Sequence, residues 1–257
     1  MKSLEESVVL AMDGNDKAIF PYLPYILQDF WEIGSSAAVM IQLIEKHAAH
    51  YVRLHILDLG CGKGAVSIQI AEKLKCKCWG FDGISAFIEE ANKLADEHGV
   101  QELCHFEVAD IREKISSIPK FDVIVLGAIG QVLGDYYQTL TKIRKCMKQE
   151  SLILIDDAYI EDSSSFSHPS LLKKKDILHQ IYLANMKIID EITVPQTEEK
   201  NEDFEQEFSN IQLRCNELIH QYPESKTLFE DYIQQQLNEY DTLENKVIPV
   251  TMVIKIK

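Results

Sequence analysis

Residues 55–64 read HILDLGCGKG, an apolar run that ends at Asp58 and gives way to glycine at every second position. Glycine adopts left-handed backbone conformations that other residues avoid, and it lets the main chain approach a ligand closely. In an open parallel sheet, ligands bind beyond the carboxyl ends of the strands, where such loops lie. The stretch therefore predicts a strand, a bare loop formed by Gly60, Gly62 and Gly64, and a nucleotide-like ligand beside that loop.

Strand and helix patterns alternate along most of the chain. We expect strands at 53–60, 76–82, 103–110, 121–128, 151–160, 187–195 and 246–257, and helices at 35–51, 64–75, 84–99, 136–147 and 171–186, with two more within 198–245, broken near Pro223. The segment FDVIVLGA at 121–128 is nearly all apolar, which is typical of a central strand covered on both faces. The alternation predicts an α/β fold with a doubly wound, mostly parallel seven-stranded sheet, N-terminal helices and a helical insertion before the last strand.

The composition is that of an ordinary globular protein. Of 257 residues, 46% are hydrophobic and 26% are charged. The sequence has neither an apolar run of about 18 residues, which a membrane span needs, nor an N-terminal signal-peptide pattern. None of the six cysteines forms a C-x-x-C pair, so we expect reduced thiols, no metal site and a cytoplasmic location.

The net charge of −15 bears on the partners of the protein. Nucleic acid would be repelled, because no basic stripe offsets this charge. Residues 198–245 alone hold 13 acidic and three basic residues, a net charge of −10. We interpret this excess as a solvated helical face, and attraction of a cationic substrate is the alternative. The sequence does not indicate an oligomeric state.

Two ligand classes compete for the glycine loop. Gly60, Gly62 and Ala65 meet the loose G-x-G-x-x-G/A pattern of dinucleotide-binding proteins. A pyrophosphate, however, requires positive charge, whereas Asp58 lies beside this loop and Lys63 is the only cation near it in the sequence. S-adenosylmethionine instead carries a sulfonium and an ammonium group. Two opposite charges ~4 Å apart attract by about 4 kcal/mol at an effective dielectric near 20. The negative charge of Asp58 therefore favours this positively charged ligand over a pyrophosphate.

The segment LDLGCGKG at 57–64 resembles the first motif of the class I S-adenosylmethionine-dependent methyltransferases, in which an acidic residue precedes a G-x-G-x-G loop. Three further segments, WGFDGIS at 79–85, VADI at 108–111 and LGAIGQ at 126–131, follow the next three strands in the family's order. The resemblance covers residues 53–160. It implies a Rossmann-like methyltransferase fold and S-adenosyl-L-methionine as the cofactor. The layout is similar to the family branch that acts on small molecules.

The resemblance also implies roles for individual residues. Asp58 would face the methionine end of the cofactor, Asp82 the ribose hydroxyls and Asp110 the adenine amino group, with Ile111 against the ring. The full set of implied cofactor contacts is Asp58, Gly60, Cys61, Gly62, Gly64, Asp82, Gly83, Asp110, Ile111 and Gly127. Each aspartate also has a structural alternative: a cap of the following helix for Asp58 or Asp82, and a turn residue for Asp110. The Gly34–Ser35 backbone either binds the methionine carboxylate or only begins a helix.

In the family, an acceptor displaces the methyl group in line, and a base is needed only if the acceptor arrives protonated. Candidate bases are Asp157, Tyr159 and His168, although the ordinary readings, a strand-end polar residue, a core-edge aromatic and a loop histidine, are favoured for them. No Asn-Pro-Pro-Tyr or Asp-Pro-Pro-Tyr segment follows the fourth strand, which argues against amino-methylation of DNA or glutamine. The alternatives are a catalytically silent S-adenosylmethionine-binding module and, less favoured, an NAD(P)-dependent oxidoreductase.

The resemblance suggests one methyltransferase domain over residues 1–257. It would comprise an N-terminal helical cap (1–50), a cofactor-binding core (51–195), a helical insertion or lid (196–246) and the last strand (247–257). The segment at 20–31 is aromatic and carries two prolines, so we expect it to be irregular and partly buried. Such aromatic and helical additions would enclose a small-molecule methyl acceptor.

Overall fold

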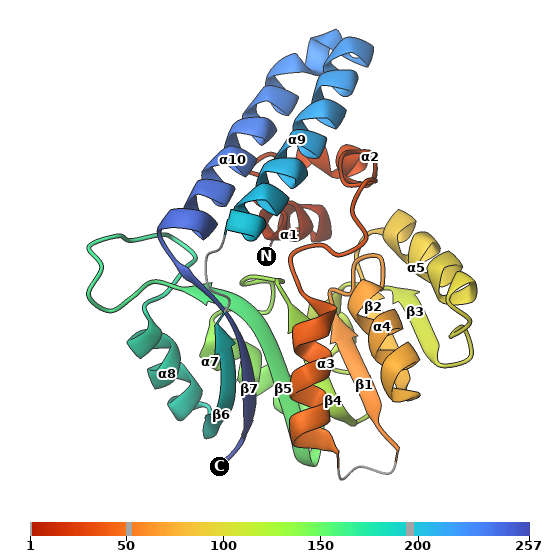
Figure 1. The fold of residues 1–257 in the computed structure, drawn as a ribbon, viewed down its shortest axis with the longest axis vertical. Coiled ribbons are helices and arrows are strands. Elements are labelled where there is room, and N and C mark those ends of the chain that lie inside the picture. Colours follow the sequence, from red (N-terminus) through yellow and green to blue (C-terminus); the bar gives the residue numbers. More distant parts are fainter. Residues whose placement is uncertain (1, 50–52, 194–197) are drawn as a thin grey trace. The chain divides into compact units, whose positions relative to one another are not determined.

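A computed structural model describes residues 2–49, 53–193 and 198–257 of the chain (Figure 1). One seven-stranded sheet has the order β3-β2-β1-β4-β5-β7-β6. Its strands are β1 His55–Leu59, β2 Lys77–Asp82, β3 Cys104–Val108, β4 Phe121–Gly127, β5 Met147–Tyr159, β6 Met186–Thr193 and β7 Ile248–Ile256. The pairs β1–β2, β1–β4, β2–β3 and β4–β5 are parallel, and β6–β7 is antiparallel. The predicted mostly parallel sheet is confirmed.

The described residues form two compact units. The sheet unit lies within Trp31–Thr193 and Pro249–Lys257, and the helical unit lies within Met1–Phe30 and Val194–Ile248. Helix α3 (Ala37–Ala48) belongs to the sheet unit, because Met40, Leu43 and Ile44 pack into the same core as the central strands. The structure therefore divides the predicted N-terminal segment after Phe30.

The sheet unit is built around β4, whose residues are buried from Phe121 to Leu126. Its other helices are α4 Ala65–Leu74, α5 Ser85–Glu97, α6 Ile111–Lys114, α7 Tyr136–Ile143, η2 Arg144–Cys146 and α8 Lys174–Leu183. Apolar residues of α3, α4 and α5 share one core cluster with Ile56 of β1 and Leu154 of β5. Burial of about 25 cal/mol per Å² of apolar surface drives this packing. It fixes the strand ends that carry the predicted site residues.

The helical unit contains α1 Leu4–Ala11, η1 Lys17–Tyr22, α2 Leu23–Ile26, α9 Glu198–Gln221, η3 Pro223–Ser225 and α10 Lys226–Asn245. The predicted break near Pro223 is confirmed. Residues 20–31 are partly buried as expected, but the expectation that they lack regular structure is wrong over η1 and α2. Pro24 occupies the first turn of α2, where its missing N–H has no partner within the helix.

No helix among residues 2–49, 53–193 and 198–257 combines the length and the apolar composition that a membrane crossing needs.

Candidate functional site

The loop after β1 has a backbone that only glycine adopts readily. The φ angles of Gly60, Gly62 and Gly64 are +77°, +51° and +75°. A β-carbon at Gly60 would lie 2.5 Å from Cγ2 of Ile129, so this position also lacks space. The N–H groups of Gly60 and Cys61 both donate to the carbonyl of Phe81, at 2.8 and 3.1 Å. These bonds hold the loop against the end of β2.

Asp58 is buried beneath this loop, with 3% of its surface exposed. Its Oδ2 accepts a hydrogen bond from the Ser67 hydroxyl of α4 at 2.7 Å. Burial raises the pKa of Asp58 to about 7, and the charge of Asp82 adds to this rise, whereas the Ser67 hydrogen bond opposes it. Gly64, not Asp58, is the N-cap of α4. Asp58 is therefore a buried carboxyl group that a cationic partner would stabilise in its charged form.

Asp82 closes the other side of the loop and is 7% exposed. Its Oδ2 accepts the Gly62 N–H and its Oδ1 accepts the Ile84 N–H, each at 2.9 Å. Burial raises the pKa of Asp82, and these backbone hydrogen bonds oppose the rise. A carboxylate offers about four acceptor positions, so Asp82 can accept a further bond beside those from backbone N–H groups, for example from a ligand hydroxyl. The helix-cap alternative is not what the structure shows, since Ile84 is the N-cap of α5.

Asp110 is the N-cap of α6 and accepts the Arg112 N–H at 2.9 Å. The Arg112 guanidinium also binds this carboxylate, with Nε 2.9 Å from Oδ1 and Nη2 2.5 Å from Oδ2, and it lowers the pKa of Asp110. The structure therefore shows the turn role that was the alternative for Asp110. Its role at an adenine ring stays a prediction. Ile111 is buried, and the Ala109 N–H donates to the carbonyl of Asp82 at 2.8 Å.

The remaining predicted loop residues have clear surroundings. Cys61 is buried, which raises the pKa of its thiol. Gly83 is half-buried and directly follows Asp82. The side chain of Lys63 is fully buried, and its Nζ lies 3.1 Å from Oε2 of Glu90. The cation of the glycine loop is thus paired with a carboxylate of α5. Within the described ranges, no group of three or more His, Cys, Asp or Glu side chains is arranged to hold a metal ion.

The segment before α3 lies against the end of β4. A β-carbon at Gly127 would be 2.7 Å from Oγ of Ser35, and one at Gly34 would be 2.8 Å from Cβ of Ala128. Ser35 is 7% exposed, and its buried Oγ has no hydrogen-bond partner among the described residues. Buried hydroxyls nearly always have a partner. The sequence pointed to the backbone here and missed this hydroxyl.

Asp157, near the end of β5, accepts the Tyr136 hydroxyl on Oδ2 at 2.7 Å and the Ala158 N–H on Oδ1 at 2.7 Å. Burial raises the pKa of Asp157 and also that of Tyr136. Sequence reasoning missed Tyr136, because its contact with Asp157 joins residues 21 positions apart.

The other two candidate bases have partners of their own. Tyr159 is buried, and Nζ of Lys174 lies 4.9 Å from the centre of its ring. Nδ1 of His168 is 3.0 Å from the Ser170 hydroxyl, the Phe166 ring stacks on its ring at 6.3 Å, and burial lowers its pKa. These contacts are with Lys174, Ser170 and Phe166, and none of them involves Asp157 or Tyr136.

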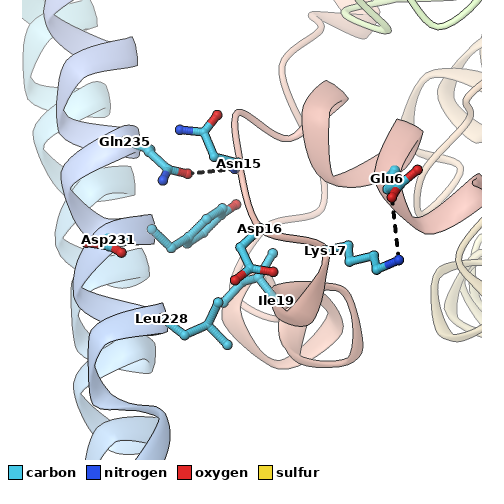
Figure 2. Close-up of a pocket in the computed structure, with 9 residues that line it drawn as sticks. Glu6, Asn15, Asp16, Lys17, Ile19, Leu228, Asp231 and Gln235 are labelled. Atoms are coloured by element: carbon cyan, nitrogen blue, oxygen red, sulfur yellow. Dashed lines mark hydrogen bonds and ion pairs between the residues drawn. The ribbon is translucent and has the colours of Figure 1, made fainter. Parts of the chain in front are cut away.

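The helical unit contains a pocket of about 360 Å³. Figure 2 shows the residues that line it, which come from α1, the segment between α1 and η1, η1 itself and α10. Leu228 and Ile19 supply apolar surface. Two of the lining residues contact each other, because the Asn15 N–H donates to Oε1 of Gln235 at 3.0 Å. This pocket contains none of the residues predicted from the sequence to bind a cofactor or act in catalysis.

A mostly parallel sheet whose first two strands end in buried carboxylates around a glycine loop defines a Rossmann-like protein of the nucleotide-cofactor class. The family model described as methyltransferase domain matches residues 52–210. The chain therefore belongs to the methyltransferase domain family.

Individual relatives agree with this assignment. The chain is 28% identical over 117 residues to the ubiquinone biosynthesis O-methyltransferase of Rickettsia akari (strain Hartford). The aligned region covers 44% of this chain and 45% of that protein. It spans less than half the length of the curated relatives it matches.

Solved structures confirm the Rossmann-like methyltransferase fold. An S-adenosyl-L-homocysteine complex of an SAM-dependent methyltransferase from Geobacter sulfurreducens superposes with a TM-score of 0.75 at 14% identity, over 92% of this chain and 98% of that one. The cyclase SpnF gives a TM-score of 0.69 at 13% identity, over 99% and 96% of the two chains. At these identities the likeness concerns the fold alone.

Proposed function

We propose that the protein transfers a methyl group from S-adenosyl-L-methionine to a small-molecule acceptor, and that the cofactor binds at the glycine loop. One observation carries this proposal: the buried carboxyl groups of Asp58 and Asp82 flank the loop, while Lys63 is already paired with Glu90. The local charge is therefore negative. It disfavours a pyrophosphate and favours a ligand that carries a sulfonium and an ammonium group.

The residues present fit this cofactor at three places. The Asp82 carboxylate has about four acceptor positions, so it can accept ribose hydroxyls in addition to the backbone N–H groups that already bind it. Asp58 can balance the positive methionine end, directly or through water. The unpartnered Ser35 hydroxyl, over Gly127, can donate to the methionine carboxylate. Asp110 would reach an adenine amino group only with the oxygen positions that Arg112 leaves open.

When bound, the cofactor supplies an activated methyl group, so little covalent chemistry remains for the protein. The chain's own part is to hold the two reactants in line and to keep water out. The rigid loop serves the first task, since the carbonyl of Phe81 and the carboxylate of Asp82 both fix its backbone. A base is needed only for an acceptor that arrives protonated.

The small-molecule acceptor follows from the family branch and from the named activity of the curated relatives. The net charge of −15 supports a partner other than nucleic acid and is compatible with a cytoplasmic protein. We also propose that residues 1–257 form a single methyltransferase domain and that residues 196–246 act as its lid.

Calorimetry tests the cofactor assignment. We expect S-adenosyl-L-homocysteine to bind and NAD to leave no heat of binding. Tight binding of NAD alone would replace the proposal with the oxidoreductase alternative.

Turnover separates an enzyme from a silent binding module. The purified chain is incubated with methyl-labelled S-adenosyl-L-methionine and a panel of small phenols, amines and thiols. A labelled product supports the proposal. Binding of the cofactor without transfer to any acceptor would favour the silent module or a different reaction. The similar structure SpnF is a cyclase, so this fold can also carry a reaction of another kind.

A further inference from the structure

Tyr136 and Asp157 form a hydrogen-bonded pair at the carboxyl edge of the sheet. Tyr136 is the first residue of α7, and a capping box between Asp135 and Gln138 fixes the start of that helix. The Tyr136 hydroxyl donates to Oδ2 of Asp157 at 2.7 Å, and the Ala158 N–H donates to Oδ1 at 2.7 Å. Two fixed elements, the first turn of α7 and the end of β5, therefore hold the pair.

The pair lies on the same edge as the glycine loop. Strand β4 separates β1 from β5, with Asp58 beside Val125 and Gly127 beside Asp156. Neighbouring strands are about 4.8 Å apart, so the end of β5 lies roughly 10 Å across the edge from that of β1. An acceptor held near the pair would therefore lie on the same edge of the sheet as a cofactor on the loop.

Asp157 and its neighbour Asp156 have different surroundings. Consecutive strand residues point to opposite faces of a sheet. Asp156 accepts the Thr251 hydroxyl of β7 on Oδ1 at 2.9 Å, whereas Asp157 faces Tyr136 of α7. Burial raises the pKa of Asp157, and the charges of Asp157 and Asp156 add to the effect of burial in raising the pKa of Tyr136. A carboxylate in this state is a stronger base than an exposed one.

A proton can pass from an acceptor to the Tyr136 oxygen while the Tyr136 proton passes to Asp157. The Tyr136 hydroxyl uses its hydrogen on Asp157, so its oxygen lone pairs are available to an incoming O–H group. A phenol with an ordinary pKa near 10 needs a base at neutral pH, whereas a neutral amine attacks without one. A thiol is already partly ionised.

We propose that Tyr136 and Asp157 accept the proton of a hydroxyl acceptor, so that the methylated group is the oxygen of a phenol or a similar O–H compound. This inference rests on the proposed function. The acceptor oxygen forms the new bond to the methyl carbon, and the electrons of the broken carbon–sulfur bond stay on sulfur. The acceptor proton moves to the Tyr136 oxygen as the Tyr136 proton moves to Asp157. Methyl ether, thioether and a protonated Asp157 result.

The activity test compares two phenols across pH, from pH 5.5 to 8.5, with Tyr136→Phe and Asp157→Asn. With unsubstituted phenol we expect Asp157→Asn to lose about 100-fold or more in turnover, a usual range for a general base, and Tyr136→Phe to lose at least about tenfold. With 4-nitrophenol, which ionises near neutral pH, the losses should be much smaller. Tyr137→Phe is the matched control, since Tyr137 is the next residue and is 44% exposed.

A second readout does not depend on turnover. The complex of the protein with S-adenosyl-L-homocysteine is titrated with 4-nitrophenol at pH 6, and the visible absorbance of its phenolate is measured. We expect more phenolate in the wild-type complex than for the free phenol at that pH, and no excess with Asp157→Asn. Thermal unfolding of each variant shows that it is folded.

Each outcome bears on a different statement. Equal losses for the two phenols, transfer to amines or thiols alone, or no phenol methylation despite cofactor binding would overturn the role of the pair. A pH profile of Tyr136→Phe that matches the wild type would reduce Tyr136 to a structural partner of Asp157. Failure of the wild type to bind S-adenosyl-L-homocysteine would instead overturn the proposed function.

Discussion

Asp82 accepts the backbone N–H of Gly62 at 2.9 Å, so the carboxylate at the end of β2 holds the loop that follows β1. The second oxygen of the same carboxylate accepts the Ile84 N–H and turns the chain into α5. One buried side chain thus joins both parallel strand ends. Its ionised form is stabilised by these N–H groups against the cost of burial.

Replacement of Asp82 by alanine should weaken binding of S-adenosyl-L-homocysteine by roughly 1–3 kcal/mol. The ribose hydroxyls of the ligand and the N–H groups of Gly62 and Ile84 would lose the carboxylate that accepts their hydrogen bonds. Calorimetry measures the change. Asp96→Ala, at an exposed position of α5, is the control and should bind as the wild type does. Unchanged affinity in Asp82→Ala would show that the side chain serves only its own turn.

Gly60→Ala and Gly99→Ala separate backbone strain from lack of space. Both glycines have left-handed φ angles, +77° and +67°, but a β-carbon at Gly60 meets Cγ2 of Ile129 at 2.5 Å, whereas none of the described atoms lies within 4 Å at Gly99. We expect Gly99→Ala to lower the free energy of unfolding by about 1–2 kcal/mol. Gly60→Ala should lose a further ~1–3 kcal/mol through the clash. Urea unfolding compares them, and equal losses would contradict the contact with Ile129.

Much of the fold could be predicted from local patterns, because strands such as β1 and β4 are short, mostly apolar and followed by a helix. The apolar run of β4 predicted a strand covered on both faces, and it is buried as expected. No local sequence pattern predicted that β7 would lie between β5 and β6 in the sheet. Strand order depends on contacts between distant residues, which periodicity does not encode.

The candidate site shows the same limit. Asp58 and Asp82 could be found because each stands at or next to the end of a strand beside the glycine loop. Arg112 lies only two residues after Asp110 and binds its carboxylate, so it would compete with an adenine amino group for the same oxygens. The spacing alone did not reveal this. Tyr136 and the Ser35 hydroxyl were missed because their roles depend on tertiary contacts, with Asp157 and Gly127.

Asp58 should make stability fall with rising pH. Its pKa in the folded protein is about 7, above the ordinary value near 3.9, so the folded state binds the proton more tightly than the unfolded state does. The contribution to stability is present below about pH 4 and is lost as pH rises to about 7, by at most about 1.4 kcal/mol per pH unit. Urea unfolding at several pH values should show a flatter profile for Asp58→Asn. Parallel profiles would contradict the raised pKa.

The same proton should oppose binding of a cationic cofactor. If S-adenosyl-L-methionine prefers ionised Asp58, its affinity rises with pH up to the pKa of about 7 and then levels off. Below that pH the slope is at most about tenfold per unit. Calorimetry between pH 5.5 and 7.5 measures it, and Asp58→Asn should remove most of the slope. A pH-independent affinity in the wild type would show that Asp58 does not sense the ligand charge.

Ser35→Ala should weaken ligand binding without lowering stability. The Ser35 Oγ is buried without a partner among the described residues, so its removal should leave the free energy of unfolding unchanged or raise it by up to about 1 kcal/mol. If this hydroxyl donates to the methionine carboxylate, the same variant should bind S-adenosyl-L-homocysteine more weakly by roughly 1–2 kcal/mol. Ser36→Ala is the neighbouring control, because the Ser36 side chain is exposed and makes no capping hydrogen bond. Urea unfolding and calorimetry on both variants supply the two numbers. A Ser35→Ala protein that loses stability and keeps full affinity would show that the hydroxyl belongs to the fold and not to the ligand site.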